Sequence, residues 1–473
     1  MSYRLRELAR SYRFAFAAAA VAVMLVVASL WAYVSYALFR DFRSGIDLTI
    51  FSQAAESMAN GNLPRSSVKG NDYILWGDHF HPIIAVVGPI YKIWPTPLSL
   101  LWVQAVAIGV ASAVLCFTGC EALRELADWS VPKALSGGIL VGLLFGVSPG
   151  IEGGAFFDFH EVALALPILA LACRSLLLDR MRSLILWSSL FLLAKEDAGL
   201  IVMGLGLVAW VRNRKSVGGI LFVGGFVWTI LCMRVFIPYF ARGPWAYGGK
   251  IPMDPDVLQE NVVSNLIHPG SLSIMLGVLV LRTGLLAPFS PFILAVVPNI
   301  ASRALTSQAE YSSLGYHYNM LLAVILIAGV IDVLCRYPRI STRLWSMVLV
   351  GCLAVTLMSA RFPRALFAAS EAERADNARC ASALIPQGEG VVADAYLTPY
   401  LSIGHSPVRE LRPDLNVSMP GGVEFPEIPW VVVDRETINY SDRGKWVERY
   451  LQESKDAGWR QMASCGSFVV LVR

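Results

Sequence analysis

Charged residues are scarce in this sequence. Only 16% of its 473 residues are charged and 56% are hydrophobic, whereas about 25% of an ordinary soluble protein is charged. So little charge excludes a chain that is surrounded by water along its whole length. The net charge of +4 is small and is spread over many short loops, so the sequence has no basic stripe for nucleic acid. We therefore expect no nucleic-acid partner.

Cysteines with an evident chemical role are also few. Six of the eight lie inside apolar runs, where cysteine usually behaves as a small hydrophobic residue: Cys116, Cys120, Cys173, Cys232, Cys335 and Cys352. Only Cys380 and Cys465 lie in a polar segment, the C-terminal tail, and they could form a disulfide if that tail is extracytoplasmic. The tail has no phosphate-cradling glycine loop, no metal-spaced Cys or His pair and no nucleophile elbow. We therefore expect a recognition or lid role for it.

Long apolar runs dominate the rest of the chain. No charged residue occurs from Phe14 to Phe39, which is enough to cross a hydrocarbon core of about 30 Å. No small-residue cleavage site precedes Arg40, so this helix should remain as an anchor. Ten further apolar stretches bring the predicted number of transmembrane helices to about eleven: Leu98–Leu115, Ala134–Val147, Val162–Leu178, Leu184–Leu193, Ala198–Val211, Val217–Ile237, Leu272–Leu286, Phe289–Ile300, Met320–Leu334 and Leu344–Met358.

Basic residues predict the orientation. Four arginines precede the first span against a single Glu7, which places the N-terminus in the cytoplasm by the positive-inside rule: Arg4, Arg6, Arg10 and Arg13. Counting spans alternately then puts the most basic short loops in the cytoplasm as well, at 174–182, 212–215 and 336–343. The same count places the loops 40–82, 150–161 and 238–270, and the tail from 361 onward, outside the cell membrane.

Two segments depart from simple spans. The stretch from Pro82 to Pro95 is short and bounded by prolines, which favours a re-entrant or interfacial helix; if it does span, every later loop changes side. Lys195, Glu196 and Asp197 interrupt the run from Leu184 to Val211, which predicts two short helices that meet at a charged outer turn.

The tail has the composition of a soluble domain. Residues 371–385 and 444–457 read as helices, and 391–394, 430–434 and 468–473 read as strands. The predicted fold is therefore a polytopic α-helical membrane domain over residues 1–360, followed by a small extracytoplasmic α/β domain over 361–473.

Histidines and acids gather at the predicted outer face. His79, His81, His160, His268 and His317 all fall there, and His405 lies in the outer domain. Ionisable residues near membrane depth are costly and are found mainly where they line a cavity or take part in function.

Simpler interpretations exist for several of these residues. Asp47 follows Ser44 by three positions and could cap an amphipathic helix. Asp158 and Glu161 could be loop acids or caps. The histidines could be hydrogen-bonded interfacial residues, or His79, His81, His160, Asp78 and Asp158 could hold a divalent metal.

Five short motifs carry a resemblance to a known family. They are Gly45-Ile46-Asp47-Leu48-Thr49-Ile50-Phe51-Ser52-Gln53, Gly77-Asp78-His79-Phe80-His81-Pro82, Asp158-Phe159-His160-Glu161, Ala194-Lys195-Glu196-Asp197 and Tyr316-His317-Tyr318. Together they resemble a bacterial and archaeal family of predicted membrane proteins, known as a domain of unknown function, over nearly the whole chain. That family is similar in layout to the GT-C glycosyltransferases, polytopic enzymes that take a sugar from a polyprenyl-phosphate carrier on the outer side of the membrane.

The GT-C resemblance implies roles for individual residues. It implies that Asp47, soon after the first span, is the general base that activates the acceptor hydroxyl, and that Asp158 is a second catalytic acid in the next outer loop. Cations beside the departing phosphate would come from Lys195, Arg242, Lys250 and Arg303, or from a divalent metal. The loop from Arg242 to Lys250 also offers Trp245 and Tyr247 as stacking rings. The remaining expected substrate-binding residues are Asp78, His79, His81, His160, Glu161, Glu196, His317 and Tyr318.

The expected function is transfer of a sugar from a polyprenyl-phosphate donor in the lipid bilayer to an envelope glycan, lipid or protein. A transporter or lipid flippase is an alternative, because it too would place charges between helices. The sequence has no convincing inverted repeat, however, and its charges cluster at the outer edge rather than at the midplane. A non-catalytic envelope-assembly protein is the third interpretation.

Overall fold

The structure is a computed structural model of the chain. It describes residues 3–70, 72–246, 254–268, 271–306, 308–338, 342–363, 372–411, 428–436 and 445–473. These residues form two compact units. The first comprises Met1–Tyr33, Trp76–Ile84 and Trp102–Pro363, and the second comprises Val34–Leu75, Ala85–Leu101 and Arg364–Arg473. The second unit thus contains the tail together with two segments that the sequence assigned to the membrane part.

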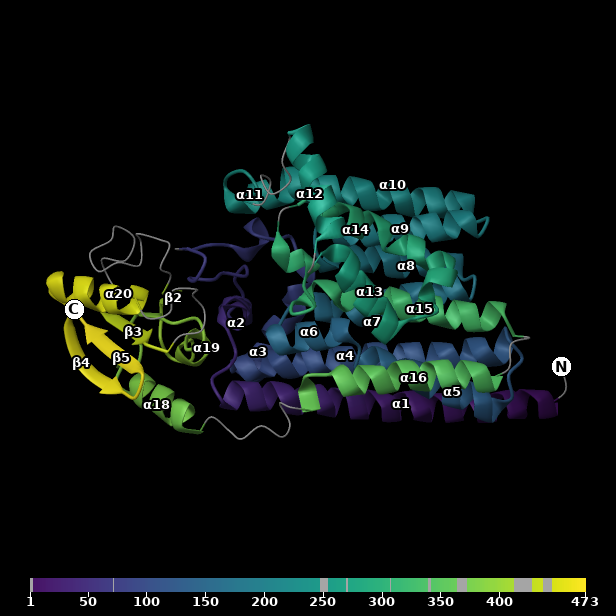
Figure 1. The fold of residues 1–473 in the computed structure, drawn as a ribbon, viewed down its shortest axis with the longest axis horizontal. Helices are drawn as coiled ribbons and strands as arrows, with labels where there is room; N and C mark the ends of the chain where they lie inside the picture. The colour runs from purple at the N-terminus through teal and green to yellow at the C-terminus, as the bar shows by residue number, and fades with distance from the viewer. Residues whose placement is uncertain are drawn as a thin grey trace. The chain divides into compact units, whose positions relative to one another are not determined.

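Helices make up most of the described chain (Figure 1). The α-helices are α1 (Tyr3–Arg40), α2 (Ile46–Ala59), α3 (Val87–Ile93), α4 (Pro97–Glu125), α5 (Val131–Gly146), α6 (Pro149–Phe157), α7 (Val162–Leu177), α8 (Met181–Phe191), α9 (Ala198–Val211), α10 (Lys215–Leu231), α11 (Ile237–Ala241), α12 (Pro255–Ile267), α13 (Leu272–Thr283), α14 (Val297–Ala304), α15 (Met320–Arg336), α16 (Thr342–Ser359), α18 (Ala372–Ala383), α19 (Thr398–Leu401) and α20 (Lys445–Asp456).

The prediction of about eleven transmembrane helices is not confirmed. Among the described residues, 6 helices are long and apolar enough to cross a membrane, or up to 7 if the bent pair α5 and α6 counts as one span. Four apolar helices are shorter: Pro82–Ile93, Val162–Leu177, Met181–Ala194 and Ala198–Val211. The short helix at Pro82 and the break between α8 and α9 agree with the sequence interpretation of these two unusual segments.

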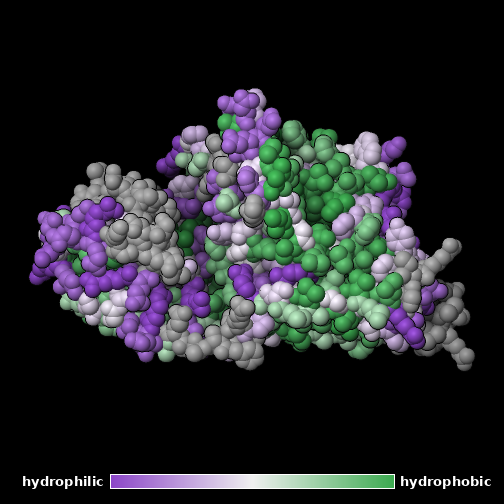
Figure 2. Space-filling view, viewed as in Figure 1, coloured by the Kyte–Doolittle hydropathy of each residue, from purple (hydrophilic) through white to green (hydrophobic). Residues whose placement is uncertain are grey.

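Apolar side chains cover much of the visible face of the helical part (Figure 2). On α10 the exposed side chains include Ile220, Val223 and Phe226, each more than half exposed. A soluble protein rarely exposes such a continuous apolar surface. The first unit is therefore built to be surrounded by lipid.

Glycines let α9 and α10 approach closely. A Cβ atom at Gly206 would lie 2.7 Å from the carbonyl oxygen of Gly218, and one at Gly199 would overlap the backbone of Gly225. Small residues at such contacts are typical of helix pairs in membranes. This packing fixes α9, and with it the charged turn that precedes it.

The predicted outer loop at 150–161 contains a helix, because α6 occupies Pro149–Phe157, and this helix is largely buried. Its Pro149 lies in the first turn, where proline is well tolerated. A Cβ atom at Gly150 would lie 2.6 Å from the carbonyl oxygen of Asn319, and one at Gly153 would overlap that of Leu314. The glycines that resemble loop residues in the sequence are therefore packing residues of a helix.

Two other predicted segments also differ. The span expected at Phe289–Ile300 consists instead of short 3-10 turns and α14, because prolines 291 and 298 lack the N–H groups that a continuous helix needs. The expected loop at 238–270 contains helix α12, which is capped by Asp254, whose side chain accepts a hydrogen bond from the N–H of Asp256.

The second unit contains a five-stranded sheet in the order β2-β1-β3-β5-β4. The strands are β1 (Val391–Ala393), β2 (Val408–Glu410), β3 (Trp430–Asp434), β4 (Arg460–Cys465) and β5 (Phe468–Val472). β1 runs parallel to β2 and β3, and β5 runs antiparallel to β3 and β4. In register, Val391 lies opposite both Val408 and Trp430, and Val432 lies opposite Val470.

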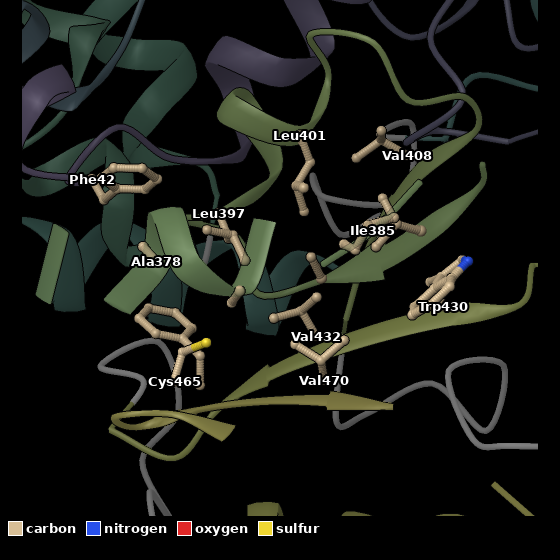
Figure 3. Packing of buried hydrophobic residues seen from close by; sticks show 14 of the residues in the cluster. Phe42, Ala378, Ile385, Leu397, Leu401, Val408, Trp430, Val432, Cys465 and Val470 are labelled. Carbon is tan, nitrogen blue, oxygen red and sulfur yellow. The ribbon is translucent and has the colours of Figure 1, made fainter. Parts of the chain in front are cut away.

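Both faces of this sheet are covered, because alternate residues of a strand point to opposite sides. Val432 and Val470 join Ala378 of α18 and Leu397 on one face (Figure 3). On the other face, Val431 belongs to a cluster with three residues of α20, Trp446, Val447 and Tyr450. The expected helices and strands of the tail are confirmed. Strand β4 was not predicted, because most of its residues are exposed.

The N-terminal segment of the second unit is part of this core. Phe42 is buried in the same cluster as Val432, and its ring stacks on Tyr400 with centroids 3.9 Å apart. The hydroxyls of Thr49 and Thr398 lie 2.7 Å apart and join α2 to α19. A disulfide links Cys380 to Cys465, as the sequence suggested for an extracytoplasmic tail.

Candidate functional site

A pocket that combines charged, polar and apolar side chains lies within the first unit. Its empty volume is about 1010 Å³, including open solvent at its mouth. The lining residues are His79, Val162, Lys195, Glu196, Asp197, Leu200, Met233, Trp245, Asn299, Ser302, Arg303, Thr306, Tyr311, His317, Tyr318 and Leu321.

The turn at 195–197 supplies three of these side chains. It separates the short 3-10 segment after α8 from α9, and the Thr229 hydroxyl of α10 donates to the Glu196 carbonyl at 3.1 Å. The Glu196 carboxylate lies 2.6 Å from His79 Nδ1 and also accepts the Phe80 N–H at 3.1 Å. Burial favours a raised pKa for Glu196, but His79 and Lys195 outweigh it and lower this pKa to about 2. Glu196 is therefore a fixed negative charge.

Lys195 is a buried cation. Its Nζ lies 3.5 Å from Oε1 of Glu161, and the two side chains are 12% and 2% exposed. Burial would lower the pKa of Lys195, but the carboxylates of Glu161, Glu196 and Asp197 outweigh it and raise this pKa well above its usual value. The lysine therefore keeps its charge in a largely apolar part of the protein.

Arg303, near the end of α14, is the second buried cation, with a side chain 9% exposed. Its Nη1 donates to the amide oxygen of Asn319 at 2.9 Å, and its Nη2 donates to the carbonyl of Tyr318. Both partners are neutral. Within the described residues Arg303 makes no ion pair, although the charge of Asp197 acts on it. We therefore consider Arg303 a candidate contact for an anionic ligand.

Aromatic rings form one wall of the pocket. His160 and His317 stack with ring centroids 3.7 Å apart, and Phe157 packs against both. Tyr318 packs edge-on against Tyr311 at 4.7 Å. The close fit of the α6 glycines against residues 314–320 positions this wall.

Nine lining residues were missed as site residues by the sequence reasoning, and Asp197 and Asn299 are two of them. Asp197 and Asn299 each have a buried side-chain oxygen, Oδ1, for which the described structure shows no hydrogen-bond partner. Buried polar atoms are nearly always paired, so these oxygens mark positions where a ligand could donate hydrogen bonds. The sequence signal for Asp197 was its place in the charged interruption, whereas nothing in the sequence distinguishes Asn299.

The structure brings together seven of the predicted site residues around the pocket: His79, Lys195, Glu196, Trp245, Arg303, His317 and Tyr318. Glu161 and His160 lie directly behind it, through their contacts with Lys195 and His317. His81 is buried and interacts electrostatically with Glu161. The Asp78 carbonyl accepts a hydrogen bond from the Trp245 indole at 3.3 Å.

Other predicted residues are not among the lining residues. Asp158 ends α6, and Gln104 fixes this turn by donating to the Asp158 carbonyl and accepting the His160 N–H. Arg242 follows α11 in a left-handed conformation. Tyr247 and Lys250 lie outside the described residues. Asp47 belongs to the second unit, in the first turn of α2, whose N-cap is Gly45.

The suggested metal ligands do not converge. Among the described residues, no group of three or more His, Cys, Asp or Glu side chains could hold a metal ion. The five suggested ligands therefore do not form a metal centre in this structure: His79, His81, His160, Asp78 and Asp158.

The fold and this pocket define a polytopic membrane protein with a buried site that charged side chains of both signs line. The chain belongs to the family of predicted membrane proteins DUF2079, whose pattern matches residues 39–470. This confirms the family resemblance seen in the sequence.

Two solved structures share the fold. They are ArnT from Cupriavidus metallidurans bound to undecaprenyl phosphate and the same protein in the apo state. Each is 12% identical to this chain, with a TM-score of 0.53, and the match covers 95% of this chain and 97% of ArnT. At this identity the likeness establishes the fold. A comparison with curated proteins gave no match.

Proposed function

We propose that this protein is a membrane glycosyltransferase that moves a sugar from a polyprenyl-phosphate donor to an acceptor of the cell envelope. The observation that carries the proposal is the pair of buried cations, Lys195 and Arg303, lining one pocket. The fold shared with ArnT, a GT-C glycosyltransferase, supports it, as does the undecaprenyl phosphate bound to one of the ArnT structures.

The pocket suits the chemistry of the donor. When the acceptor oxygen attacks the anomeric carbon, the bond from that carbon to the phosphate oxygen breaks and negative charge moves onto the phosphate. Fixed cations in a site that excludes water stabilise such charge strongly. Lys195 and Arg303 would carry out this role, and the Oδ1 atoms of Asp197 and Asn299 would accept hydrogen bonds from sugar hydroxyls.

Removal of the acceptor proton requires a base. We retain Asp47 as the proposed base, on the GT-C resemblance. Its place in the first turn of α2 gives a second reason for a carboxylate there, because negative charge is favourable near a helix N-terminus. A catalytic role and a helix-stabilising role for Asp47 predict different effects of the substitution Asp47→Asn.

We further propose that the reaction takes place on the outer side of the membrane, with the N-terminus in the cytoplasm and the tail outside. This orientation needs an odd number of spans, which the count of seven, with α5 and α6 as one bent span, supplies and the count of six does not. The disulfide between Cys380 and Cys465 supports an oxidising compartment for the tail.

The test is sugar transfer by purified protein in proteoliposomes supplied with radiolabelled polyprenyl-phosphate sugars and an envelope extract as acceptor. We expect transfer by the wild type and a loss of at least about 10²-fold in Arg303→Gln, since removing one stabilising charge from a transition state has this effect. Wild-type protein that turns over none of these donors would contradict the proposal and favour a transporter or an assembly protein.

A further inference from the structure

The second unit contains a groove of its own, which we call the polar groove. Its empty volume is about 940 Å³, including open solvent. The residues that line it come from α2, from the segment after α2 and from two turns of the tail, and all of them belong to the second unit. They are Gln53, Glu56, Ser57, Asn60, Arg65, Ser66, Ser67, Asp72, Gly388, Ser402, Gly404, His405 and Ser406.

Hydrogen bonds hold the parts of the polar groove together. The side-chain amide of Gln53 donates to the Ser67 hydroxyl at 3.0 Å and accepts from the Ser66 hydroxyl at 2.8 Å. Ser67 donates in turn to the carbonyl of Val408 in β2 at 3.0 Å, a residue 341 positions further along the chain. The groove is therefore organised before a ligand arrives, which lowers the entropic cost of binding.

Other side chains of the polar groove are placed to contact a ligand. His405 is only 7% exposed, and its Nδ1 atom has no hydrogen-bond partner within the described residues. Buried polar atoms are nearly always paired, so this ring marks a position for a polar ligand atom. Glu56, Asn60 and Ser406 also line the groove, and all three are exposed. The groove thus combines a fixed polar framework with accessible polar side chains.

The chemistry of the lining selects one class of ligand. None of the described lining residues is hydrophobic, so a lipid chain would gain no apolar contact there. Asp72 already pairs with Arg65, and the carboxylate of Glu56 therefore leaves an excess of negative charge that repels an anion. Hydroxyls and side-chain amides both donate and accept hydrogen bonds, as sugar hydroxyls do, whereas a peptide N–H only donates. An uncharged saccharide therefore suits this lining best.

We infer that the polar groove binds the acceptor, and that the acceptor presents an uncharged, hydroxyl-rich saccharide there. The inference rests on the proposed function and adds the chemical class of the acceptor and its binding site. Helix α2 carries the proposed base Asp47 in its first turn and Gln53 and Ser57 of the groove further on. These two residues lie about 9 and 15 Å from Asp47 along the helix axis, at about 1.5 Å per residue. The groove holds the part of the acceptor beyond the reacting hydroxyl and so positions that hydroxyl.

The test measures saccharide binding by NMR and calorimetry to the full-length protein in lipid nanodiscs, since detergents with sugar head groups would compete. The probes are maltotetraose and chitotetraose, which are uncharged, tetragalacturonate, which is anionic, and the peptide tetraglycine. We expect an uncharged tetrasaccharide to bind and tetragalacturonate to bind at least about tenfold more weakly, because like charges oppose its entry. Glu56→Gln should reduce this difference, because it removes the repelling charge.

The double variant Asn60→Ala, Ser406→Ala tests the location of the site. Both side chains are exposed, so their removal leaves the buried core intact, and equal unfolding midpoints check this. Loss of two neutral hydrogen bonds should weaken saccharide binding by about tenfold. Asn62→Ala is the matched control, because Asn62 is exposed in the same segment but is not a lining residue, and it should bind saccharide as the wild type does.

Three results would overturn the inference: no saccharide binding by the wild type, unchanged affinity in the double variant, or preference for tetraglycine or tetragalacturonate over both saccharides. Turnover of polyprenyl-phosphate sugars is measured separately on the same preparations. Donor turnover without saccharide binding would remove the polar groove from the account and leave the proposed function intact. Saccharide binding that the double variant weakens, in a protein that turns over no donor, would instead contradict the proposed function and retain the saccharide site.

Discussion

Nζ of Lys195 lies 3.5 Å from Oε1 of Glu161, and this buried pair joins the start of α7 to the turn before α9. Each charge needs the other, since an unpaired charge in a low-dielectric site is costly. The pair therefore holds the start of α7 against the turn before α9, and it also neutralises two buried charges beside the pocket.

Glu161→Gln should strongly destabilise the protein, by about 3 kcal/mol, because it leaves a buried lysine without its nearest carboxylate. The measurement is the unfolding midpoint in detergent. Asp179→Asn is the control, because Asp179 pairs with Arg214 at an exposed site, where ion pairs contribute little. Equal unfolding midpoints for the two variants would mean that the buried pair does not stabilise the protein.

Gly153→Ala should lower stability and weaken ligand binding together. Its new methyl group would overlap the carbonyl of Leu314 and displace the segment that carries His317 and Tyr318. Gly277→Ala is the matched control, because no atom lies within 4 Å of a Cβ atom there, and alanine in a helix should be neutral or slightly stabilising. Midpoints and undecaprenyl phosphate affinity measured on both variants check this, and unaffected binding in Gly153→Ala would disprove the packing role.

The sequence predicted the charged turn at 195–197 and the chemistry-bearing histidines because a charge inside an apolar run stands out. It did not predict Asn299, whose role depends only on burial, or helix α6, whose glycines and proline resemble those of a loop. The grouping of His79 with Glu196, 117 positions apart, depends on helix packing that no local pattern records. The edge strand β4 was missed because most of its side chains are exposed, and so lack the alternation of a half-buried strand.

Asp47→Asn distinguishes the catalytic and structural explanations of Asp47. Asparagine is nearly as good as aspartate at a helix N-terminus, so a structural role forecasts little change. A general base cannot be replaced in this way, and we expect sugar transfer to fall by at least about 10² while insertion is normal. Transfer in proteoliposomes at matched protein levels measures this, and undiminished turnover would remove Asp47 from the mechanism.

The tail should face outward, as the positive-inside rule predicts from the arginines that precede the first span. Protease added to intact spheroplasts should therefore remove an epitope placed after Arg473. A periplasmic protein retained on the membrane serves as the accessibility control. Survival of the epitope while that control is digested would reverse the proposed orientation.

The most direct measurement is a cryo-electron microscopy structure of the full-length protein with undecaprenyl phosphate. The account predicts phosphate density in the first-unit pocket, within about 3 Å of Lys195 Nζ and of the Arg303 guanidinium, the usual length of a charge-assisted hydrogen bond. Phosphate density elsewhere in the protein, with this pocket containing only water, would contradict the assignment of Lys195 and Arg303 to the donor phosphate.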